Sequence, residues 1–560
     1  MRPSLPRLAV ALAVLVAVRS EAVSQESPPP AGEEPDLSLP ADLEPEAGIP
    51  TGEDLEAAGA RIGKIRIHRL NIFDPNDPKE SFILFRLANR LHVISRDQVI
   101  RRELLFQEGD LYRQDLIDES ERNLRAIRVI YHVKIQPIDY HDGVVDLEVV
   151  TQDTWTLRPS IKVSRAGGNT TSSVGFVETN LLGHFKVLQF AHRKEIDRST
   201  TGFFYSDPRL FGSRYTLSSS YERHSDGKSR ALSIARPFYS LDSRWSMSAS
   251  GEHVEQHDRL FENGDDISEF REFREAVSLS YAFSGGLVDA KVKRYGLGAG
   301  YLRRKFSQEP GDTGFGVVPL AEDQKFVGPF FTVERLKSRF IKVVNYNHFE
   351  REEDFNLGND LNFSLQLSLR SFGADRSEGI LNFTDSFGVP VSDSTNLLFN
   401  FSASGRAGAG EVSNVILSES IESYWRVTLH QTFYTRMAYD AGIHLDRQNQ
   451  FLLGGDNGLR GYPSRQFAGD RRLLVTLEHR YFGDWEIFRL IRIGFATFAD
   501  AGDAWYDSPD LHSDFGLGLR FAVSRSSVAS VSRLDLAYSV DAKETDSPRL
   551  QLLFGTALKF

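Results

Sequence analysis

Apolar and polar residues alternate with a period of two through most of residues 155–560. Because successive side chains of a strand point to opposite faces, each alternating run predicts a strand with one apolar and one polar face. The clearest runs are 361–369, 515–523, 534–540 and 550–560. Nearly three-quarters of the chain, at its carboxy-terminal end, is therefore predicted to consist of antiparallel strands.

Two architectures explain such alternation. A soluble β-sandwich buries one face of each strand, whereas a membrane barrel turns the apolar face to lipid and the polar face to a wet lumen. Here the apolar face often ends in aromatic residues and the polar face carries Arg, Asp and Gly, which favours a barrel. Residues 155–560 predict a transmembrane antiparallel β-barrel of about 16 strands, or as many as about 19 if segments such as 158–163 and 340–348 are divided.

The preceding residues, 61–152, have a mixed pattern. Apolar residues alternate first, then recur twice at helical spacing, and finally alternate in two runs separated by the turn signal Asp142-Gly143. The corresponding segments are 62–72, 99–106, 116–127, 129–135 and 145–149. This order predicts a small α/β domain with the element sequence β-α-α-β-β.

Two further segments lie at the amino terminus. Residues 1–22 have the pattern of a signal peptide, since Arg2 and Arg7 precede an apolar run that is too short to span a bilayer as a helix. Residues 23–60 are rich in Pro and acidic residues and contain no Lys or Arg, and they account for most of the net charge of −11. We expect a disordered periplasmic segment there, either a solvated spacer or a binding tail.

Composition and motifs exclude several functions. The chain has no cysteine, which excludes disulfides, thiol nucleophiles and cysteine-ligated zinc. Residues 61–560 are nearly neutral, so no nucleic-acid partner is expected. We find no H-E-x-x-H, G-x-S-x-G or P-loop motif and predict no catalytic, cofactor or metal site. An outer-membrane hydrolase using Ser and His is left as the weakest alternative.

One loop motif suggests a family. The sequence Leu459-Arg460-Gly461-Tyr462 resembles the [V/L]-R-G-[F/Y] signature on the sixth extracellular loop of the outer-membrane assembly-factor superfamily, also called the bacterial surface antigen family. Residues 498–505 resemble its F-x-D-x-G strand end, residues 61–152 resemble its POTRA domain, and the terminal Phe560 resembles the carboxy-terminal signal of outer-membrane barrels. The family includes barrel-assembly factors, autotransporter-assembly factors and two-partner-secretion transporters.

This resemblance implies a sixteen-stranded barrel in the bacterial outer membrane with a POTRA domain in the periplasm. The implied partners are unfolded outer-membrane or secreted polypeptides, outer-membrane lipid and periplasmic accessory proteins, and the implied activity is polypeptide insertion or translocation. Only one such domain is recognisable, fewer than in the principal assembly factors, which suggests a specialised role. A passive diffusion pore is the main alternative.

Strand parity gives the motif arginine possible partners. Alternation places Glu478 and Asp500 on the lumen faces of their strands. A loop folded back into the barrel would set Arg460 against Asp500, with Glu478 as a second candidate, and in the family this arginine contact pins the loop. The alternative is an exposed surface turn with an unpaired arginine.

The barrel seam is the second candidate site. Closure requires the first strand, around 158–163, to pair with the last, 549–560. Pro159 has no N–H to donate, so it either weakens the seam in favour of lateral opening or simply starts the strand. If the seam opens, cysteines replacing Ile161 and Leu553 are expected to lock it.

Overall fold

The computed structural model describes residues 48–75, 83–127, 129–308, 320–349, 352–487, 490–523, 531–541 and 549–557. The predicted signal peptide, the acidic segment up to residue 47 and Phe560 lie outside the described residues. Within the described part of the chain, no helix is long and apolar enough to cross a membrane.

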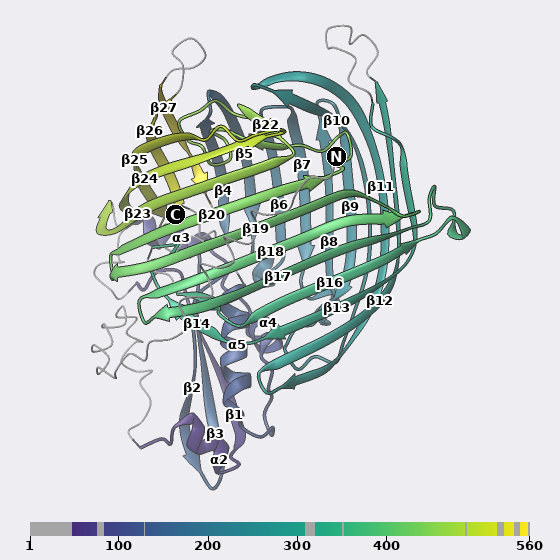
Figure 1. Cartoon of the computed structure of the whole chain (residues 1–560). Coiled ribbons are helices and arrows are strands. Elements are labelled where there is room, and N and C mark those ends of the chain that lie inside the picture. The colour runs from purple at the N-terminus through teal and green to yellow at the C-terminus, as the bar shows by residue number, and fades with distance from the viewer. Residues whose placement is uncertain are drawn as a thin grey trace, which may run out of the picture. The chain divides into compact units, whose positions relative to one another are not determined.

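A small α/β module comes first (Figure 1). Its elements are α2 (Gly52–Ala57), β1 (Arg61–Leu70), α3 (Ile83–Leu91), α4 (Asp97–Glu103), α5 (Gln114–Ala126), β2 (Ile130–His141) and β3 (Val144–Asp153). The strands form a sheet in the order β1-β3-β2, with β1 parallel and β2 antiparallel to the central β3. Side chains of β3 such as Leu147 and Val149 are fully buried, because the helices cover the sheet.

The module begins earlier than predicted. Residues 48–60 were expected to be disordered, but α2 forms there, with a capping box between Thr51 and Asp54. Leu55 and Ala60 are fully buried in the core of the module. Helix α3 was also not predicted. The six residues of α2 are too few to show a helical period, so the cap and the burial of Leu55, rather than periodicity, explain this helix.

A closed antiparallel barrel follows. Its twenty strands, counted within the described residues, are β4 (Leu157–Ala166), β5 (Asn169–Glu178), β6 (Val187–Lys194), β7 (Ser199–Asp207), β8 (Thr216–His224), β9 (Gly227–Arg236), β10 (Trp245–Glu262), β11 (Asp265–Val288), β12 (Lys291–Gln308), β13 (Gln324–Lys337), β16 (Asn359–Ser368), β17 (Glu378–Ser392), β18 (Thr395–Gly408), β19 (Glu411–Thr428), β20 (Gln431–Ile443), β23 (Arg471–Ile487), β24 (Ile491–Trp505), β25 (His512–Val523), β26 (Val531–Ser539) and β27 (Leu550–Ala557). Strand β27 neighbours β4 and completes the ring. The expected fold class of a large antiparallel barrel is therefore confirmed.

The predicted number of about 16 strands is wrong. Strands β4–β9 are only 8–10 residues long, and turns as short as Ser225-Asp226 join them. Strand β8 is mostly Ser, Thr and charged residues, so its alternation is weak. The segment 340–348 is not a barrel strand either, because β14 (Phe340–Val343) pairs with β15 (Glu353–Asn356) as a separate hairpin.

The extra strands precede the loop motif. In a sixteen-stranded up-and-down barrel, the sixth loop on one side is followed by five strands. The loop that carries Arg460 connects β20 to β23, and five barrel strands, β23–β27, follow it within the described residues. The carboxy-terminal part of the barrel thus keeps the expected arrangement, and the additional strands lie on the amino-terminal side.

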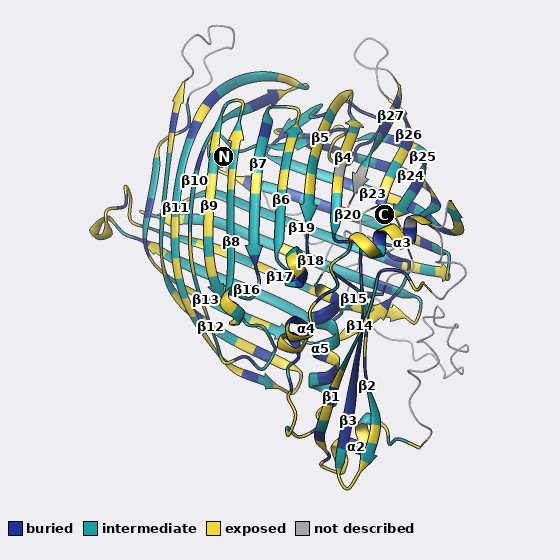
Figure 2. Cartoon of the chain, turned by 180° about the vertical axis from the view of Figure 1, so that it is seen from behind, coloured by how far each residue is buried: buried dark blue, intermediate teal, exposed yellow. Residues whose placement is uncertain are grey.

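The outward faces of the strands are apolar. On β11, Leu279, Tyr281 and Phe283 are more than half exposed at every second position, and Phe515 and Leu517 repeat the pattern on β25. Figure 2 shows the resulting rows of exposed residues along the strands. A closed barrel that presents such a face is suited to lipid contact, since its strands form a ring and the apolar side chains avoid water.

Candidate functional site

The loop between β20 and β23 folds onto the lumen side of the barrel wall. A short hairpin of β21 (Phe451–Leu453) and β22 (Phe467–Gly469) holds its two ends together. Between them, Leu459 and Tyr462 are buried in one apolar cluster with Leu474 of β23. Gly458 has φ +141°, and a Cβ there would lie 2.3 Å from Leu474 Cδ2, so only glycine allows this close approach.

Arg460 contacts both carboxylates that strand parity indicated. Its Nε and Nη2 donate to the two oxygens of Asp500 at 2.7 and 3.1 Å, and its Nη1 donates to Glu478 Oε2 at 2.9 Å. The guanidinium lies over the Phe498 ring, 3.5 Å from its centroid. Arg460 is 5% exposed and Asp500 2%. In this buried setting the bidentate pair with Asp500 and the contact with Glu478 fix the loop to β24 and β23.

The charge cluster extends further than the sequence indicated. Arg480 donates to Glu478 Oε1 at 2.9 Å, and Arg520 of β25 pairs with Asp535 of β26. Arg520 also approaches Glu478, with Nη2 3.6 Å from Oε2. Parity placed these side chains in the lumen, but no sequence signal specified which of them pair, because that depends on the register of the neighbouring strands β23–β26.

Beyond Arg460 the loop reaches the last strands. The Gly461 N–H donates to Asp514 Oδ2 at 2.8 Å. The Tyr462 hydroxyl donates to the Ser513 carbonyl at 3.1 Å and bonds Asp541, which follows β26. A Cβ at position 461 would lie 2.6 Å from Asp514 Cβ, which explains the need for glycine there. All four residues of the motif therefore contact or pack against the barrel wall.

The same loop also holds the first barrel strand. The Ser464 N–H donates to the Gly167 carbonyl at 2.9 Å, and its hydroxyl donates to the Ala166 carbonyl at 3.1 Å. Ala166 is the last residue of β4, one of the two seam strands. The next residue, Arg465, pairs with Asp197 in the β6–β7 loop at 2.6 and 2.7 Å. One loop thus connects β23 and β24 to the seam.

The seam itself has little backbone pairing. Within the described residues, β27 and β4 share a single register pair, Phe554 with Arg165. Pro159 lies opposite Phe176 of β5, on the other side of its strand. Its predicted effect on the seam stays a prediction.

The cysteine pair expected to lock the seam is misplaced. Ile161 is 80% exposed on the outer face, whereas Leu553 is 1% exposed and packs with Ala166 on the inner face. The two side chains therefore point to opposite faces of the sheet. Alternation in residues 550–560 places Leu553 on the face opposite Leu552, so the mismatch of faces follows from parity, whereas the register between β27 and β4 does not.

A second segment occupies the lumen side near the other end of the barrel. It is the β13–β16 connection, which contains the β14–β15 hairpin. Tyr346 is 2% exposed and stacks on Tyr424, with ring centroids 4.8 Å apart. The Asn345 amide donates to the Leu429 carbonyl at 2.9 Å, which ties the segment to the β19–β20 turn.

This hairpin segment joins the charge cluster to the small module. The Nε of Arg480 donates to Glu478, and its Nη1 donates to the Tyr346 carbonyl at 2.8 Å. On the other side, Arg125 of α5 pairs with Asp354 of β15 at 3.1 and 3.3 Å. A continuous set of contacts therefore leads from α5 to Arg460. The hairpin was not predicted, because the segment 340–348 was counted among the barrel strands, and no sequence signal indicated Arg125.

Within the described residues, no group of three or more His, Asp or Glu side chains is placed to hold a metal ion. The site consists of buried ion pairs and packed loop residues, and its chemistry is that of a structural lock.

Comparisons with known proteins complete the description. No protein-family model matches the sequence. No curated protein sequence matches it either. Among solved structures, the chain is similar to BamA from Haemophilus ducreyi lacking POTRA domains 1–3, at 14% identity over 88% of this chain and 84% of that chain, with a TM-score of 0.38. It is also similar to CdiB from Escherichia coli, at 11% identity over 90% and 77%, with a TM-score of 0.45. The FrpB iron transporter from Neisseria meningitidis matches at 8% identity over 77% and 87%, with a TM-score of 0.38.

Proposed function

We propose that this protein inserts polypeptides into the bacterial outer membrane or translocates them across it, and that the chain enters the barrel wall at the β4–β27 seam. The observation that carries this proposal is the seam itself: within the described residues, one register pair joins β27 and β4, whereas each of these strands pairs along its length with its other neighbour. An incoming β-strand can bond to such an edge with little loss of existing hydrogen bonds. No covalent step is required, so we propose a non-enzymatic role.

The motif loop would control this edge. Ser464 holds the end of β4 while Arg460 is anchored on β23 and β24. Release of the Ser464 contacts would free the end of β4 and leave the rest of the barrel paired. We therefore propose that the predicted role of Arg460, Asp500 and Glu478 as a lock is to keep the loop in place against the seam.

The small module would capture the polypeptide, as a periplasmic POTRA domain does. The outer edge of β1 is covered, because the Ile62 N–H donates to the Asp110 carbonyl and the Gly109 N–H to the Ile62 carbonyl, both at 2.8 Å. The outer edge of β2 is the better candidate for strand addition. Pro137 within β2 lacks a donor and is typical of an edge strand. The Ile135 N–H on this edge donates to the Glu121 side chain at 2.7 Å, so a strand that added along residues 130–136 would displace this side-chain bond.

Two features oppose a passive pore. The Arg460 loop and the β14–β15 segment both pack against the lumen face, and each is held by buried side chains such as Leu459 and Tyr346. Well-packed segments of this kind would obstruct diffusion through an open channel. Single-channel recordings of the purified protein are expected to show small, irregular conductance, and a large steady conductance would favour the pore.

The closing experiment identifies the client proteins, which are the polypeptides that this protein would insert or translocate. The gene is deleted and the outer-membrane proteome is quantified, with complementation by the wild-type chain. We expect a defined group of outer-membrane or secreted proteins to be depleted and then restored, as suits a device with one capture module. An unchanged proteome, with loss of small-solute uptake instead, would contradict the proposal.

A photo-crosslinking residue tests capture directly. It is placed at Lys134 on β2 and, as the matched control, at Arg66 on β1, since both side chains are exposed. We expect adducts with unfolded client polypeptide from position 134 and few from position 66. Equal yields from the two edges would argue against addition to β2.

A further inference from the structure

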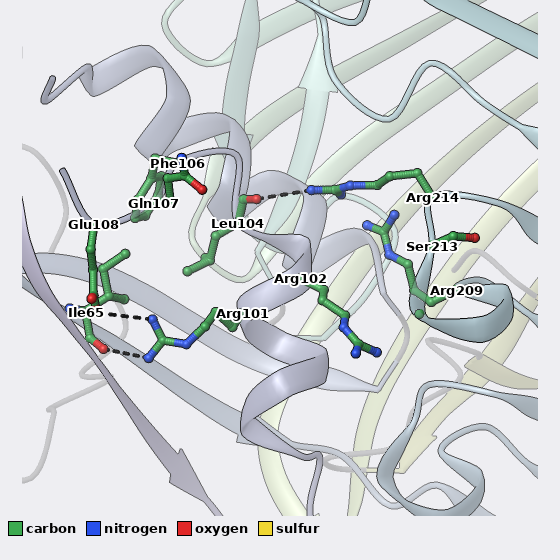
Figure 3. A pocket seen from close by; sticks show the side chains of 11 residues that line it. Ile65, Arg101, Arg102, Leu104, Phe106, Gln107, Glu108, Arg209, Ser213 and Arg214 are labelled. Atoms are coloured by element: carbon green, nitrogen blue, oxygen red, sulfur yellow. Dashed lines mark hydrogen bonds and ion pairs between the residues drawn. The ribbon is translucent and has the colours of Figure 1, made fainter. Parts of the chain in front are cut away.

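A cavity of about 500 Å³ lies between helix α4 and the turn that joins β7 to β8. Figure 3 shows Arg101 and Arg102 extending from α4 in different directions, with Arg209 and Arg214 across the cavity. A second cavity of about 270 Å³ adjoins it, and Arg102, Arg209 and Gly212 line both. Basic side chains therefore surround the joint space.

Three of the cations around the cavities have carboxylate partners. The pairs are Arg209 with Glu103, Lys186 with Asp207, and Arg101 with Glu108. Arg102 and Arg214 form no ion pair with a carboxylate within the described part of the chain. Arg214 donates one hydrogen bond, to the Leu104 carbonyl at 3.3 Å. The cavity therefore has an excess of positive charge, which comes from these two guanidinium groups.

The β7–β8 turn lies close to the Arg102 guanidinium. Gly212 has φ +76°, and a Cβ there would lie 2.8 Å from Arg102 Nη1, so glycine allows the guanidinium to lie against the turn. Burial, together with the neighbouring cations Arg96 and Lys186, lowers the pKa of His184 at the edge of the cavity. The local field therefore favours an anion.

The cavity borders the lipid-facing surface. Phe190 of β6 and Phe203 of β7 are opposite each other and are 51% and 43% exposed on the outer face. Lys186 and Tyr205, which line the smaller cavity, share the parity of these two residues. A lysine and a tyrosine at the end of an apolar strand face are typical of the level of lipid headgroups.

Apolar side chains protrude on both sides of the charged cavity. Phe211, in the β7–β8 turn, is 99% exposed, and Leu182, in the β5–β6 turn, is 63% exposed. Both have left-handed backbone conformations, with φ 52° and 57°, which bulky residues rarely adopt. In water such turns would gain nothing from presenting these side chains. Among acyl chains both side chains would be favourably placed.

Helix α3 continues this apolar surface. Ile83, Leu87 and Leu91, spaced four residues apart, are 63%, 49% and 56% exposed. The adjoining Val93 is also exposed, and its carbonyl accepts a hydrogen bond from the Asn180 amide next to Leu182, at 3.1 Å. The exposed apolar stripe of α3 is thus connected to the β5–β6 turn, as in a helix that lies in a membrane interface.

We propose that the cavity between α4 and the β7–β8 turn binds the phosphate of an anionic glycerophospholipid from the adjacent membrane leaflet. Arg102 and Arg214 would bind the phosphate oxygens, and Phe211 and Leu182 would enter the acyl layer on either side. Bound lipid would hold the module against the barrel through Arg102, which belongs to α4, and Arg214, which belongs to the barrel. This binding site is separate from the polypeptide path proposed above.

The test uses the full chain purified in detergent, titrated with phosphatidylglycerol and, separately, with phosphatidylcholine, and read by native mass spectrometry. The double variant Arg102→Gln, Arg214→Gln is expected to bind phosphatidylglycerol about tenfold more weakly than wild type, because it loses two charge-assisted contacts. The matched control is Arg244→Gln, Lys293→Gln, which removes two exposed cations elsewhere and is expected to change binding less than about twofold. Equal loss in both double variants would overturn the proposal in favour of diffuse charge.

Two further measurements test the apolar contacts and distinguish a lipid from a free anion. Phe211→Ser leaves every cation in place and is expected to weaken binding of long-chain phosphatidylglycerol but not of a soluble short-chain analogue. If inorganic phosphate displaces phosphatidylglycerol as well as that analogue does, the site takes a free anion and the lipid proposal fails. Unchanged heat-modifiability on gels establishes that each variant is folded, and a folded Arg102→Gln, Arg214→Gln protein with wild-type lipid binding would also refute it.

Discussion

Two places in the barrel wall are closed in different ways. Between β23 and β24 the ladder runs from Arg471 opposite Trp505 to Ile487 opposite Ile491, with one irregularity. Between β27 and β4, Phe554 opposite Arg165 is the single register pair in the described residues. The first junction is held by backbone hydrogen bonds, whereas the second depends on the loop that is anchored on the first. A barrel built in this way has a stable wall and one junction whose strength side chains can set.

The largest effect is expected from locking the weak junction. Directly opposed residues of an antiparallel pair are close enough for a disulfide, so cysteines replacing Arg165 and Phe554 are expected to crosslink. If the seam opens during function, the oxidised protein should fail to restore client proteins in the deletion strain, and reduction should restore them. The readout is the quantified outer-membrane proteome.

The control crosslinks β24 to β25, the junction next to the well-paired β23–β24 junction. Phe495 of β24 and Leu519 of β25 are also directly opposed, and cysteines there are expected to crosslink without loss of function. The pair Ile161→Cys, Leu553→Cys serves as a second control, since its side chains lie on opposite faces and no crosslink is expected. Full activity of the oxidised Arg165→Cys, Phe554→Cys protein would contradict lateral opening.

Removing the anchor is expected to give the next largest effect. Arg460→Ala leaves Asp500 buried without its bidentate partner and removes one of the cations that contact Glu478, which keeps Arg480. We expect the free energy of unfolding to fall by about 3–5 kcal/mol. Urea unfolding in detergent, followed by tryptophan fluorescence, measures this change. Arg376→Ala removes an exposed pair with Glu322 and is expected to cost less than about 1 kcal/mol. Similar losses in both variants would show that Arg460 is an ordinary surface contact.

The two junctions also differ in how far the sequence predicts them. Runs such as 515–523 show clear alternation and appear as β25, and the contact of Arg460 with Asp500 follows from parity and the motif together. The seam register was not predictable, because Leu553 and Ile161 belong to strands that are far apart in sequence. The role of Ser464 was not predictable either, since its partners are backbone carbonyls, which carry no sequence signal.

The third prediction concerns the contact between α5 of the small module and the β14–β15 hairpin. Arg125→Ala leaves Asp354 and Glu121 without a shared cation, and we expect faster hydrogen exchange in residues 340–356. A cycle with Arg460→Ala measures whether the two ends are coupled: independent sites add to within about 0.5 kcal/mol, whereas transmission through Arg480 and Tyr346 requires a larger deviation. Arg113→Ala, which removes an exposed pair with Asp115 at the start of the same helix, is the control.

The smallest effect is expected where the loop meets the seam. Ser464→Ala removes one hydrogen bond, to the Ala166 carbonyl, and keeps the backbone bond to Gly167. The expected cost is about 1 kcal/mol, too little to unfold the barrel. Because this bond holds the end of β4, the loss should be local, and hydrogen exchange in residues 157–166 should become several-fold faster, about fivefold for 1 kcal/mol.

The pattern of exchange decides the interpretation of Ser464. Ser218→Ala removes a hydroxyl contact with Ser206 on β8 and β7, away from the seam, and is expected to leave residues 157–166 unchanged. If Ser464→Ala accelerates exchange evenly around the barrel, the loop stabilises the whole wall and has no special relation to the seam. If the acceleration is confined to β4 and β27 while β23 and β24 stay protected, the junction is weakened independently of its anchor, which is the property that a lateral entry site requires.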